Sequence, residues 1–402
     1  MEYTRPNRFL YRLTQVAAWF VAVFLFGRRI VRNELKGVKG PFVVIANHQA
    51  AYDFVNLIGL CRRPMTFVIS SSFYQTLPVK GILRHIGVIP KQQFRTSVGD
   101  MKRMKAVLER GEPLVIYPAG LMCEDGLSTP IPEATYKFLK WLDADVYMAR
   151  TAGTYFAMPK WSKKLRPGRT ELDVYRLFTR QELAALEVEE VRARAREALL
   201  FDAYREQERL RVRYRGGSSV EGLENVLYLC PHCRQEFSVK AEGRRLTCSA
   251  CGYELESDEY GFLHNRKGLG EELRYVSDWS TLIARHLEER VREGSEGSLS
   301  AHCRIRMIDG EKNRFVDVGG GEMTLSRAGF RIVGDIGGSP ADLTVPLAGV
   351  PSLPFGPGSY LEIQHGKTIY RCLPDDGRVV IKFIHLVKIF HRLRMEAETV
   401  KL

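Results

Sequence analysis

The sequence has no apolar stretch as long as the ~20 residues that a membrane-spanning helix needs. Its most apolar segment, Leu13 to Phe26, is shorter than that. It also has no long internal repeat, no extended low-complexity tract, and only eight cysteines among 402 residues. With 45% hydrophobic and 27% charged residues, the composition is that of an ordinary folded protein, and the length allows two or three domains.

Arginine residues flank the apolar segment Leu13 to Phe26 on both sides. This pattern fits a helix that enters one leaflet and stays on the cytoplasmic side. A secretory signal peptide is one alternative, but no small-residue cleavage site follows the segment. A buried core helix is another. The net charge of +13 also favours an acidic membrane surface or a nucleic acid as partner. We expect a peripheral or monotopic protein on the cytoplasmic face of the cell membrane.

A histidine and an aspartate follow an apolar, β-branched run that reads as a buried strand. The run 42–46 ends in Asn47-His48, and Asp53 comes five residues after the histidine. This spacing lets a carboxylate orient an imidazole at the end of a sheet, so that the imidazole can accept a proton from an alcohol. No serine nucleophile is evident nearby, so the alcohol would belong to the substrate. Alternatively, Asp53 caps a helix and His48 is an ordinary polar residue at a strand end.

Four of the cysteines form two C-x2-C pairs with fourteen residues between them: Cys230 and Cys233, then Cys248 and Cys251. Two such pairs supply four thiolates to one tetrahedral zinc ion, so we predict a structural Zn²⁺ site. Gly252 follows the second pair where the chain must turn sharply. His232 lies inside the first pair and is not expected to be a ligand. Two disulfides are the alternative, but the other cysteines are scattered, as expected of reduced thiols in the cytosol.

The pattern along the chain predicts an α/β domain, a small zinc ribbon and a C-terminal antiparallel β domain closed by a helix. We expect one charged helix from Gln181 to Arg211, opened by a capping box at Thr179 and Glu182. A basic amphipathic helix, 382–394, ends the β domain and is expected to pack its apolar stripe on its own sheet. The expected segments are a membrane-associated N-terminal helix (1–35), the α/β domain (36–215), the ribbon (222–265), a helical linker (270–298) and the β domain (299–402).

The first half of the chain, roughly residues 8 to 210, resembles the glycerolipid acyltransferase family, which includes the 1-acylglycerol-3-phosphate acyltransferases. Asn47-His48 through Asp53 matches the N-H-x-x-x-x-D block of that family, in which the histidine is the base and the aspartate orients it. Gly87-Val88-Ile89-Pro90 and Val146–Ala149 resemble two further blocks. The C-terminal region resembles a pleckstrin-homology or GRAM domain in its pattern of short alternating strands.

Three positions depart from the family pattern. Ala119 and Met122 replace a glutamate and an arginine in the run Tyr117-Pro118-Ala119-Gly120-Leu121-Met122, and Gln93 stands where an arginine is usual. Lys91 and Arg95 are close enough to substitute for that arginine. The groups associated with a phosphate-bearing acceptor are therefore altered, while the proton-transfer pair is intact.

The resemblance implies an O-acyltransferase that moves a fatty acyl group from acyl-CoA or acyl carrier protein to a lysophospholipid or related glycerolipid in phospholipid biosynthesis. The implied catalytic residues are His48 and Asp53. Those implied to bind substrate are Asn47, Lys91, Arg95, Tyr117 and Gly120. The alternative is a non-catalytic lipid-binding or scaffold protein. The expected partners are membrane lipids and the acyl donor, with protein partners open for the ribbon and C-terminal domain. We do not expect nucleic acid, because the ribbon offers few aromatic side chains for stacking.

Overall fold

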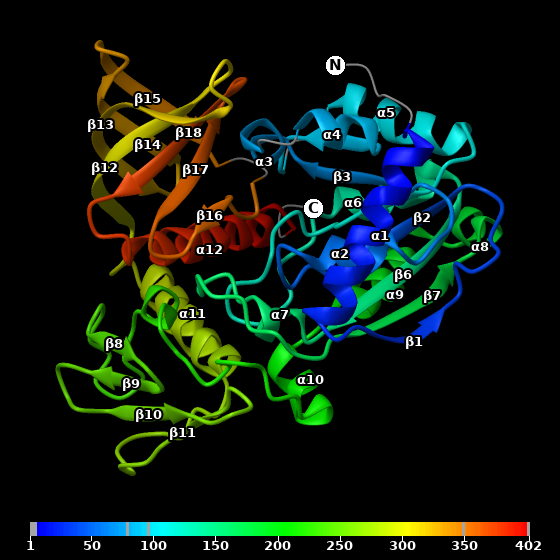
Figure 1. Cartoon of the computed structure of the whole chain (residues 1–402). Helices are drawn as coiled ribbons and strands as arrows, with labels where there is room; N and C mark the ends of the chain where they lie inside the picture. Colours follow the sequence, from blue (N-terminus) through cyan, green and yellow to red (C-terminus); the bar gives the residue numbers. More distant parts are fainter. Residues whose placement is uncertain (1–5, 78–79, 95–96, 348–349, 400–402) are drawn as a thin grey trace. The chain divides into compact units, whose positions relative to one another are not determined.

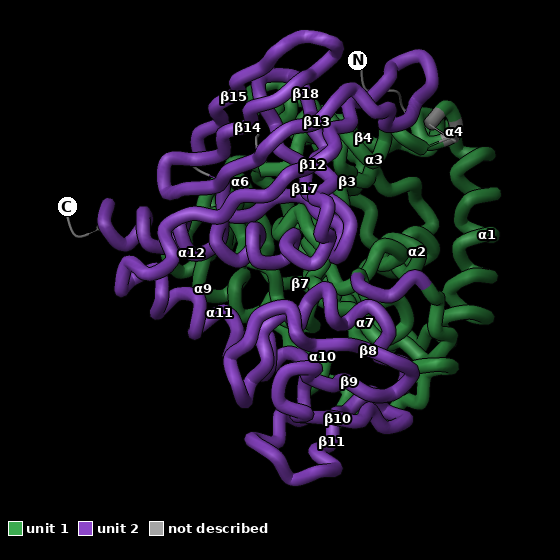
Figure 2. The backbone as a smooth tube through the Cα atoms, turned by 90° about the vertical axis from the view of Figure 1, so that its left-hand side faces the viewer, with its two compact units in different colours: residues 1–160, 164–217 green, residues 161–163, 218–402 purple. Residues whose placement is uncertain are grey.

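The computed structural model describes residues 6–77, 80–94, 97–347 and 350–399. The chain divides into two compact units (Figures 1 and 2). Unit 1 comprises residues 1–160 and 164–217, and unit 2 comprises 161–163 and 218–402. The finer division into five segments stays a prediction.

Unit 1 is built on a seven-stranded mixed sheet in the order β1-β7-β6-β2-β5-β3-β4. All neighbouring strands run parallel except β6 and β7, which are antiparallel. The strands are β1 (Arg29–Asn33), β2 (Phe42–Ala46), β3 (Thr66–Ser70), β4 (Val88–Lys91), β5 (Leu114–Ile116), β6 (Asp145–Ala152) and β7 (Glu171–Phe178). The α/β layer is as predicted, although the sequence revealed neither β1 nor β4.

Strand β2 lies in the middle of this sheet, and all five of its residues are buried. Alternate residues of a strand point to opposite faces. Val44 therefore packs into one hydrophobic core with α1 and α2, and Val43 into a second core with α5, α6 and α9. The helices of this unit are α1 (Arg8–Phe24), α2 (Asp53–Ile58), α3 (Ser71–Thr76), α4 (Lys80–His85), α5 (Val98–Glu109), α6 (Ala134–Leu142), α7 (Thr154–Ala157), α8 (Arg180–Ala185), α9 (Val188–Leu199) and α10 (Ala203–Leu210).

Helix α1 is amphipathic and packs one side against the rest of unit 1. Asn7 caps it by accepting the N–H groups of Phe9 and Leu10. On the inner side, the amide of the buried Gln15 donates to the carbonyls of Ile58 and Cys61, which ties α1 to the end of α2. Within the described residues, no helix combines the length and the apolar character that crossing a bilayer requires.

The predicted single helix from Gln181 to Arg211 is wrong, because this segment forms three helices, α8, α9 and α10. The chain is extended at Leu186 and again at Leu200. Each helix then starts with its own cap. Thr179 and Glu182 form the expected capping box, Glu187 and Glu190 form a second, and Asp202 accepts two N–H groups of α10. Charge density alone gave no sign of these breaks.

Unit 2 contains a small four-stranded antiparallel sheet in the order β11-β10-β9-β8. Its strands are β8 (Val239–Glu242), β9 (Arg245–Cys248), β10 (Glu254–Ser257) and β11 (Leu263–His264), preceded by the 3-10 helix η1 (Leu223–Asn225). The four cysteines of the predicted ribbon lie around this sheet. Helix α11 (Val276–Arg292) follows, and its Trp279 Nε1 donates to the carbonyl of Leu229.

The C-terminal part of unit 2 is a seven-stranded antiparallel sheet in the order β15-β14-β13-β12-β18-β17-β16. Helix α12 (Val379–Thr399) ends it. The strands are β12 (Ser298–Asp309), β13 (Arg314–Ser326), β14 (Gly329–Ile336), β15 (Pro340–Pro346), β16 (Phe355–Gly356), β17 (Tyr360–His365) and β18 (Thr368–Pro374). Phe383 of α12 is fully buried and stacks on Phe330 of β14, as predicted for a stripe that packs on its own sheet. The resemblance to a pleckstrin-homology or GRAM domain stays a prediction.

Candidate active site and metal centre

The structure brings His48 and Asp53 together at the carboxyl end of β2. Their side chains meet through His48 Nδ1 and Asp53 Oδ2, 2.9 Å apart. The Asp53 side chain has no exposed surface, whereas that of His48 is 20% exposed. Among the described residues, none bonds to His48 Nε2. The pair therefore has a buried acid that orients the ring and a partly exposed nitrogen that can exchange a proton with a ligand.

The backbone around Asp53 shows why this carboxylate is not a helix cap. Its Oδ2 also accepts the N–H groups of Gln49 (2.7 Å) and Ala50 (2.9 Å), which precede α2. The loop 47–52 thus wraps around one carboxylate oxygen. This geometry rules out the alternative in which Asp53 caps α2, and it rigidly links the positions of His48 and Asp53.

Asn47 and Gln49 hold this loop to the neighbouring strand β6. Asn47 bonds to Thr151 with both ends of its amide: Nδ2 donates to the carbonyl (2.8 Å), and Oδ1 accepts the backbone N–H (2.8 Å). The amide of Gln49 donates to the Thr151 carbonyl and to Glu206, and accepts from Thr154 and Tyr155. Both side chains are buried and bonded to the neighbouring elements, so they position His48. The substrate-binding role predicted for Asn47 stays a prediction.

Gln49 was not identified from the sequence, because its partners lie more than a hundred residues away in the chain. One of them, Glu206 of α10, also pairs with Arg150 (2.9 Å). Burial raises the pKa of the Glu206 carboxyl above its usual range. No local pattern around Gln49 signals these contacts.

Tyr117 follows β5 and packs its ring against His48. The two ring centroids are 4.4 Å apart, and the planes are inclined by 33°. Gly120, at φ +68°, closes a turn in which its N–H donates to the carbonyl of Tyr117 (3.0 Å). The carbonyl of Gly120 accepts from Gln93 Nε2 (2.6 Å). The Gly120 N–H is therefore already bonded within the turn.

Two of the residues predicted to bind substrate, Lys91 and Arg95, belong to the region around β4. Lys91 ends β4, its Nζ donates to the carbonyl of Gln92 (3.0 Å), and burial lowers its pKa. Gln93, which replaces the usual arginine, is bonded to Ser70 as well as to Gly120. Arg95 lies outside the described residues. The substrate-binding roles of Lys91, Arg95, Tyr117 and Gly120 stay predictions.

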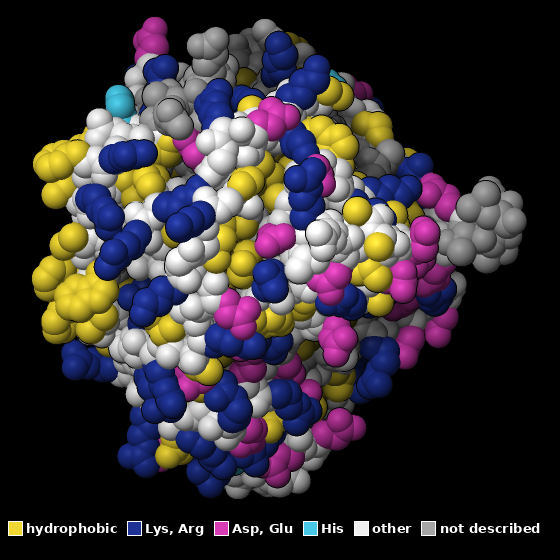
Figure 3. Space-filling model, turned by 90° about the vertical axis from the view of Figure 1, so that its right-hand side faces the viewer, with side chains coloured by type: hydrophobic (Ala, Val, Ile, Leu, Met, Phe, Trp, Pro, Cys, Tyr) yellow, Lys and Arg dark blue, Asp and Glu magenta, His cyan; other side chains and the backbone are white. Residues whose placement is uncertain are grey.

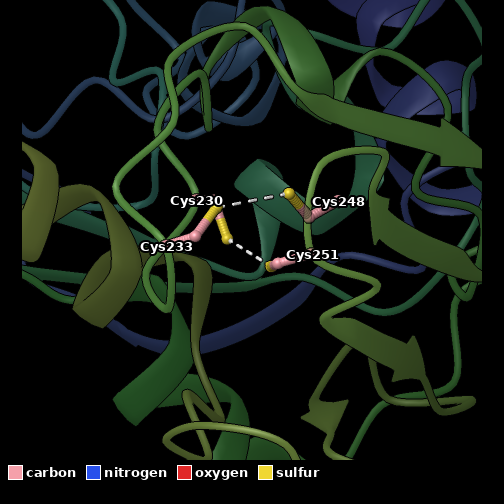
Figure 4. A group of neighbouring side chains, drawn as sticks. All are labelled: Cys230, Cys233, Cys248 and Cys251. Carbon is pink, nitrogen blue, oxygen red and sulfur yellow. Dashed lines mark hydrogen bonds between the residues drawn. The ribbon is translucent and has the colours of Figure 1, made fainter.

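The four cysteines form a compact cluster, with all four Sγ atoms within 4.8 Å of one another (Figure 4). The Sγ–Sγ distance is 3.7 Å both for Cys230 and Cys251 and for Cys233 and Cys248. A tetrahedral zinc ion with Zn–S bonds of 2.3 Å would hold its ligands about 3.8 Å apart. The donor set and its spacing thus fit zinc without rearrangement.

The two cysteine pairs have matching backbone geometry. The residue after each pair has a left-handed φ, +60° at Arg234 and +76° at Gly252. Each of these residues donates its N–H to the carbonyl of the first cysteine of its pair. The sharp turn expected at Gly252 is confirmed. Because all four thiols converge on one point, a tetrahedral ion there would have four protein ligands and no open coordination position, which agrees with a structural site.

Comparison with known proteins agrees with this geometry. The family model described as Acyltransferase matches residues 27–158. Residues 27–158 contain β2, His48, Asp53 and Tyr117, so the resemblance to this family predicted from the sequence is confirmed for this segment. A crystal structure of the 1-acyl-sn-glycerophosphate (LPA) acyltransferase PlsC from Thermotoga maritima is similar at 16% sequence identity and a TM-score of 0.41. The similarity covers 50% of this chain and 79% of that one.

Proposed function

We propose that the protein is an O-acyltransferase that moves a fatty acyl group from a thioester to the hydroxyl of a lysophospholipid or related glycerolipid. The donor would be acyl-CoA or acyl carrier protein. The observation that carries the proposal is the His48–Asp53 pair, with Nδ1 held at 2.9 Å from a buried carboxylate and the other ring nitrogen without a protein partner among the described residues.

In this reaction His48 Nε2 removes the proton of the acceptor hydroxyl while the oxygen attacks the thioester carbonyl. The C–S bond then breaks, and the departing thiolate takes the proton from the imidazolium. Asp53 stabilises the imidazolium between these two steps, and no acyl-enzyme forms. Burial of the Asp53 carboxylate strengthens its attraction to the imidazolium of His48, because little water screens the two charges.

The acceptor is the least constrained part of the proposal. 1-Acylglycerol-3-phosphate is one candidate. However, Ala119 and Met122 carry no charge, and Gln93 bonds to Ser70 and Gly120. A phosphate next to the reacting hydroxyl would lose the bidentate contact of an arginine at these positions. A lysolipid without a phosphate beside the hydroxyl therefore suits these residues better.

A lysolipid library tests the proposal. Purified protein would be incubated with acyl-CoA or acyl carrier protein thioester and the library, and the products identified by mass spectrometry. We expect a singly acylated product from at least one lysolipid, and none with His48→Ala. No product with the parent protein across the library, with intact lipid recovered bound to it, would instead support the lipid-binding alternative that Ala119 and Met122 suggest.

We also propose that α1 docks on the cytoplasmic face of the membrane. Five of its apolar side chains are more than half exposed and recur at helical spacing: Phe9, Leu13, Val16, Phe20 and Phe24. Hydrophobic side chains gather along one margin of the surface seen in Figure 3, with Lys and Arg side chains beside them. An exposed apolar stripe next to positive charge suits the interface of an anionic bilayer, from which a lysolipid would reach His48.

A further inference from the structure

One oxygen of the catalytic carboxylate has no hydrogen bond. Asp53 Oδ2 accepts from His48, Gln49 and Ala50. Asp53 Oδ1 is buried, and no partner for it is found among the described residues. A buried carboxylate oxygen without a donor costs about 1–3 kcal/mol or more, so an acid that must stay ionised at this place needs a further donor.

A second buried polar atom without a partner lies beside this pair. The hydroxyl of Tyr117 is enclosed, and none of the described residues bonds to it. Its ring is held against the ring of His48, which in turn bonds to Asp53. Burial, with a contribution from the charge of Asp53, raises the pKa of Tyr117 well above its usual range, so the hydroxyl keeps its proton and can donate it in a hydrogen bond.

We propose that Tyr117 is a positioning residue for the catalytic pair: its hydroxyl supplies, through one bridging water molecule, the hydrogen bond that Oδ1 of Asp53 lacks. Tyr117 then holds the pair in two ways. Its ring supports the face of the imidazole, and its hydroxyl satisfies the oxygen of Asp53 that is not bonded to His48. This assigns to Tyr117 a role different from substrate binding, and it rests on the proposed function of His48.

Asn56 is the competing donor. It lies one turn after Asp53 on α2, and both polar atoms of its side chain are buried and unpartnered within the described chain. Residues three apart on a helix are neighbours, so its amide is close enough in sequence to reach Asp53. Tyr117 is favoured because its ring is in contact with His48. The experiment therefore compares Tyr117→Phe with Asn56→Ala.

Steady-state kinetics of acyl transfer test the positioning role of Tyr117. We expect Tyr117→Phe to lower kcat about tenfold, since an acceptor is left unpaired, with KM for the acceptor and donor unchanged. In an Asp53→Asn background, Tyr117→Phe should cause no further loss. Asn56→Ala and the matched control Tyr147→Phe, a buried tyrosine of β6, should leave kcat unchanged. A raised KM, or a full tenfold loss in the Asp53→Asn background, would overturn the assignment.

A second readout does not depend on turnover. A proton on His48 Nδ1 that bonds to a carboxylate gives a low-field ¹H NMR resonance, which His48→Ala should abolish. We expect Tyr117→Phe to move this resonance, and Asn56→Ala and Tyr147→Phe to leave it in place. If the parent transfers no acyl group, the proposed function fails while this measurement still decides the role of Tyr117. An unmoved resonance in Tyr117→Phe would refute it.

Discussion

At the scale of single residues, the position of the proposed catalytic pair depends on two buried side chains beside it. Asn47 and Gln49 flank His48 and attach it to β6 and α7 through buried hydrogen bonds. The orientation of the imidazole is thus fixed from both sides, by Asp53 through Nδ1 and by this amide network through the backbone.

Gln49→Leu should destabilise unit 1 by about 1–3 kcal/mol, because Thr154, the Thr151 carbonyl and the buried Glu206 each lose a hydrogen bond. Urea unfolding followed by tryptophan fluorescence and circular dichroism measures this. Gln181→Leu, at an exposed position of α8, serves as the matched control and should change stability by less than about 0.5 kcal/mol. Equal stability of the two variants would show that the Gln49 network contributes little.

The sequence identified His48 and Asp53 because their spacing within one loop is local. It did not identify Gln49 or the structural use of Asn47, because those roles depend on Thr151 and Tyr155, which only the fold brings near. Gly120 shows the same limit: only the fold reveals that its N–H is bonded within the turn that it closes.

At the scale of elements, the cysteine cluster is joined to the helix that closes the C-terminal sheet. Lys382 of α12 is almost fully buried and pairs with Glu236 (2.8 Å), three residues after Cys233, and with Glu296 (2.9 Å). Arg378 donates to the carbonyl of Phe237 (2.9 Å). The fold of the ribbon thus determines where the partners of Lys382 and Arg378 lie.

Removal of zinc should unfold the ribbon and weaken the packing of α12. Zinc contributes roughly 10–16 kcal/mol to the folding of such small modules. We expect one zinc per chain by elemental analysis, a large drop in the unfolding temperature with a strong chelator, and recovery when zinc is added back. Cys233→Ser should reproduce the chelated state, while Cys61→Ser should bind a full equivalent of zinc. A protein without bound metal and with the same unfolding temperature after chelation would contradict a structural zinc site.

The buried strand over 42–46 was predicted well, and it forms β2. The segment 180–210 was not, because its charged residues suit a helix throughout, and the new caps at Glu187 and Asp202 that begin α9 and α10 were not recognised. The exposed edge strand β1 has mixed polarity, which explains why periodicity did not reveal it.

At the scale of the whole molecule, the positive charge and the stripe on α1 lead to a prediction about membranes. Phe20→Ser with Phe24→Ser should weaken binding to anionic vesicles at least about tenfold, since each phenylalanine contributes about 1.5–3 kcal/mol when buried in the interface. Vesicle co-sedimentation measures this. Val333→Ser, which removes an exposed apolar side chain of unit 2, is the control and should bind like the parent. Unchanged binding of the double variant would exclude α1 as the docking surface.

The most direct test of the account is the release of free thiol from an acyl thioester on addition of a lysolipid. The parent should release thiol in proportion to the acylated lipid formed. His48→Ala should lose at least about 100-fold in rate, and His85→Ala, an exposed histidine of α4, should retain the parent rate. Parent-like release by His48→Ala would contradict the claim that this imidazole takes the proton of the acceptor hydroxyl.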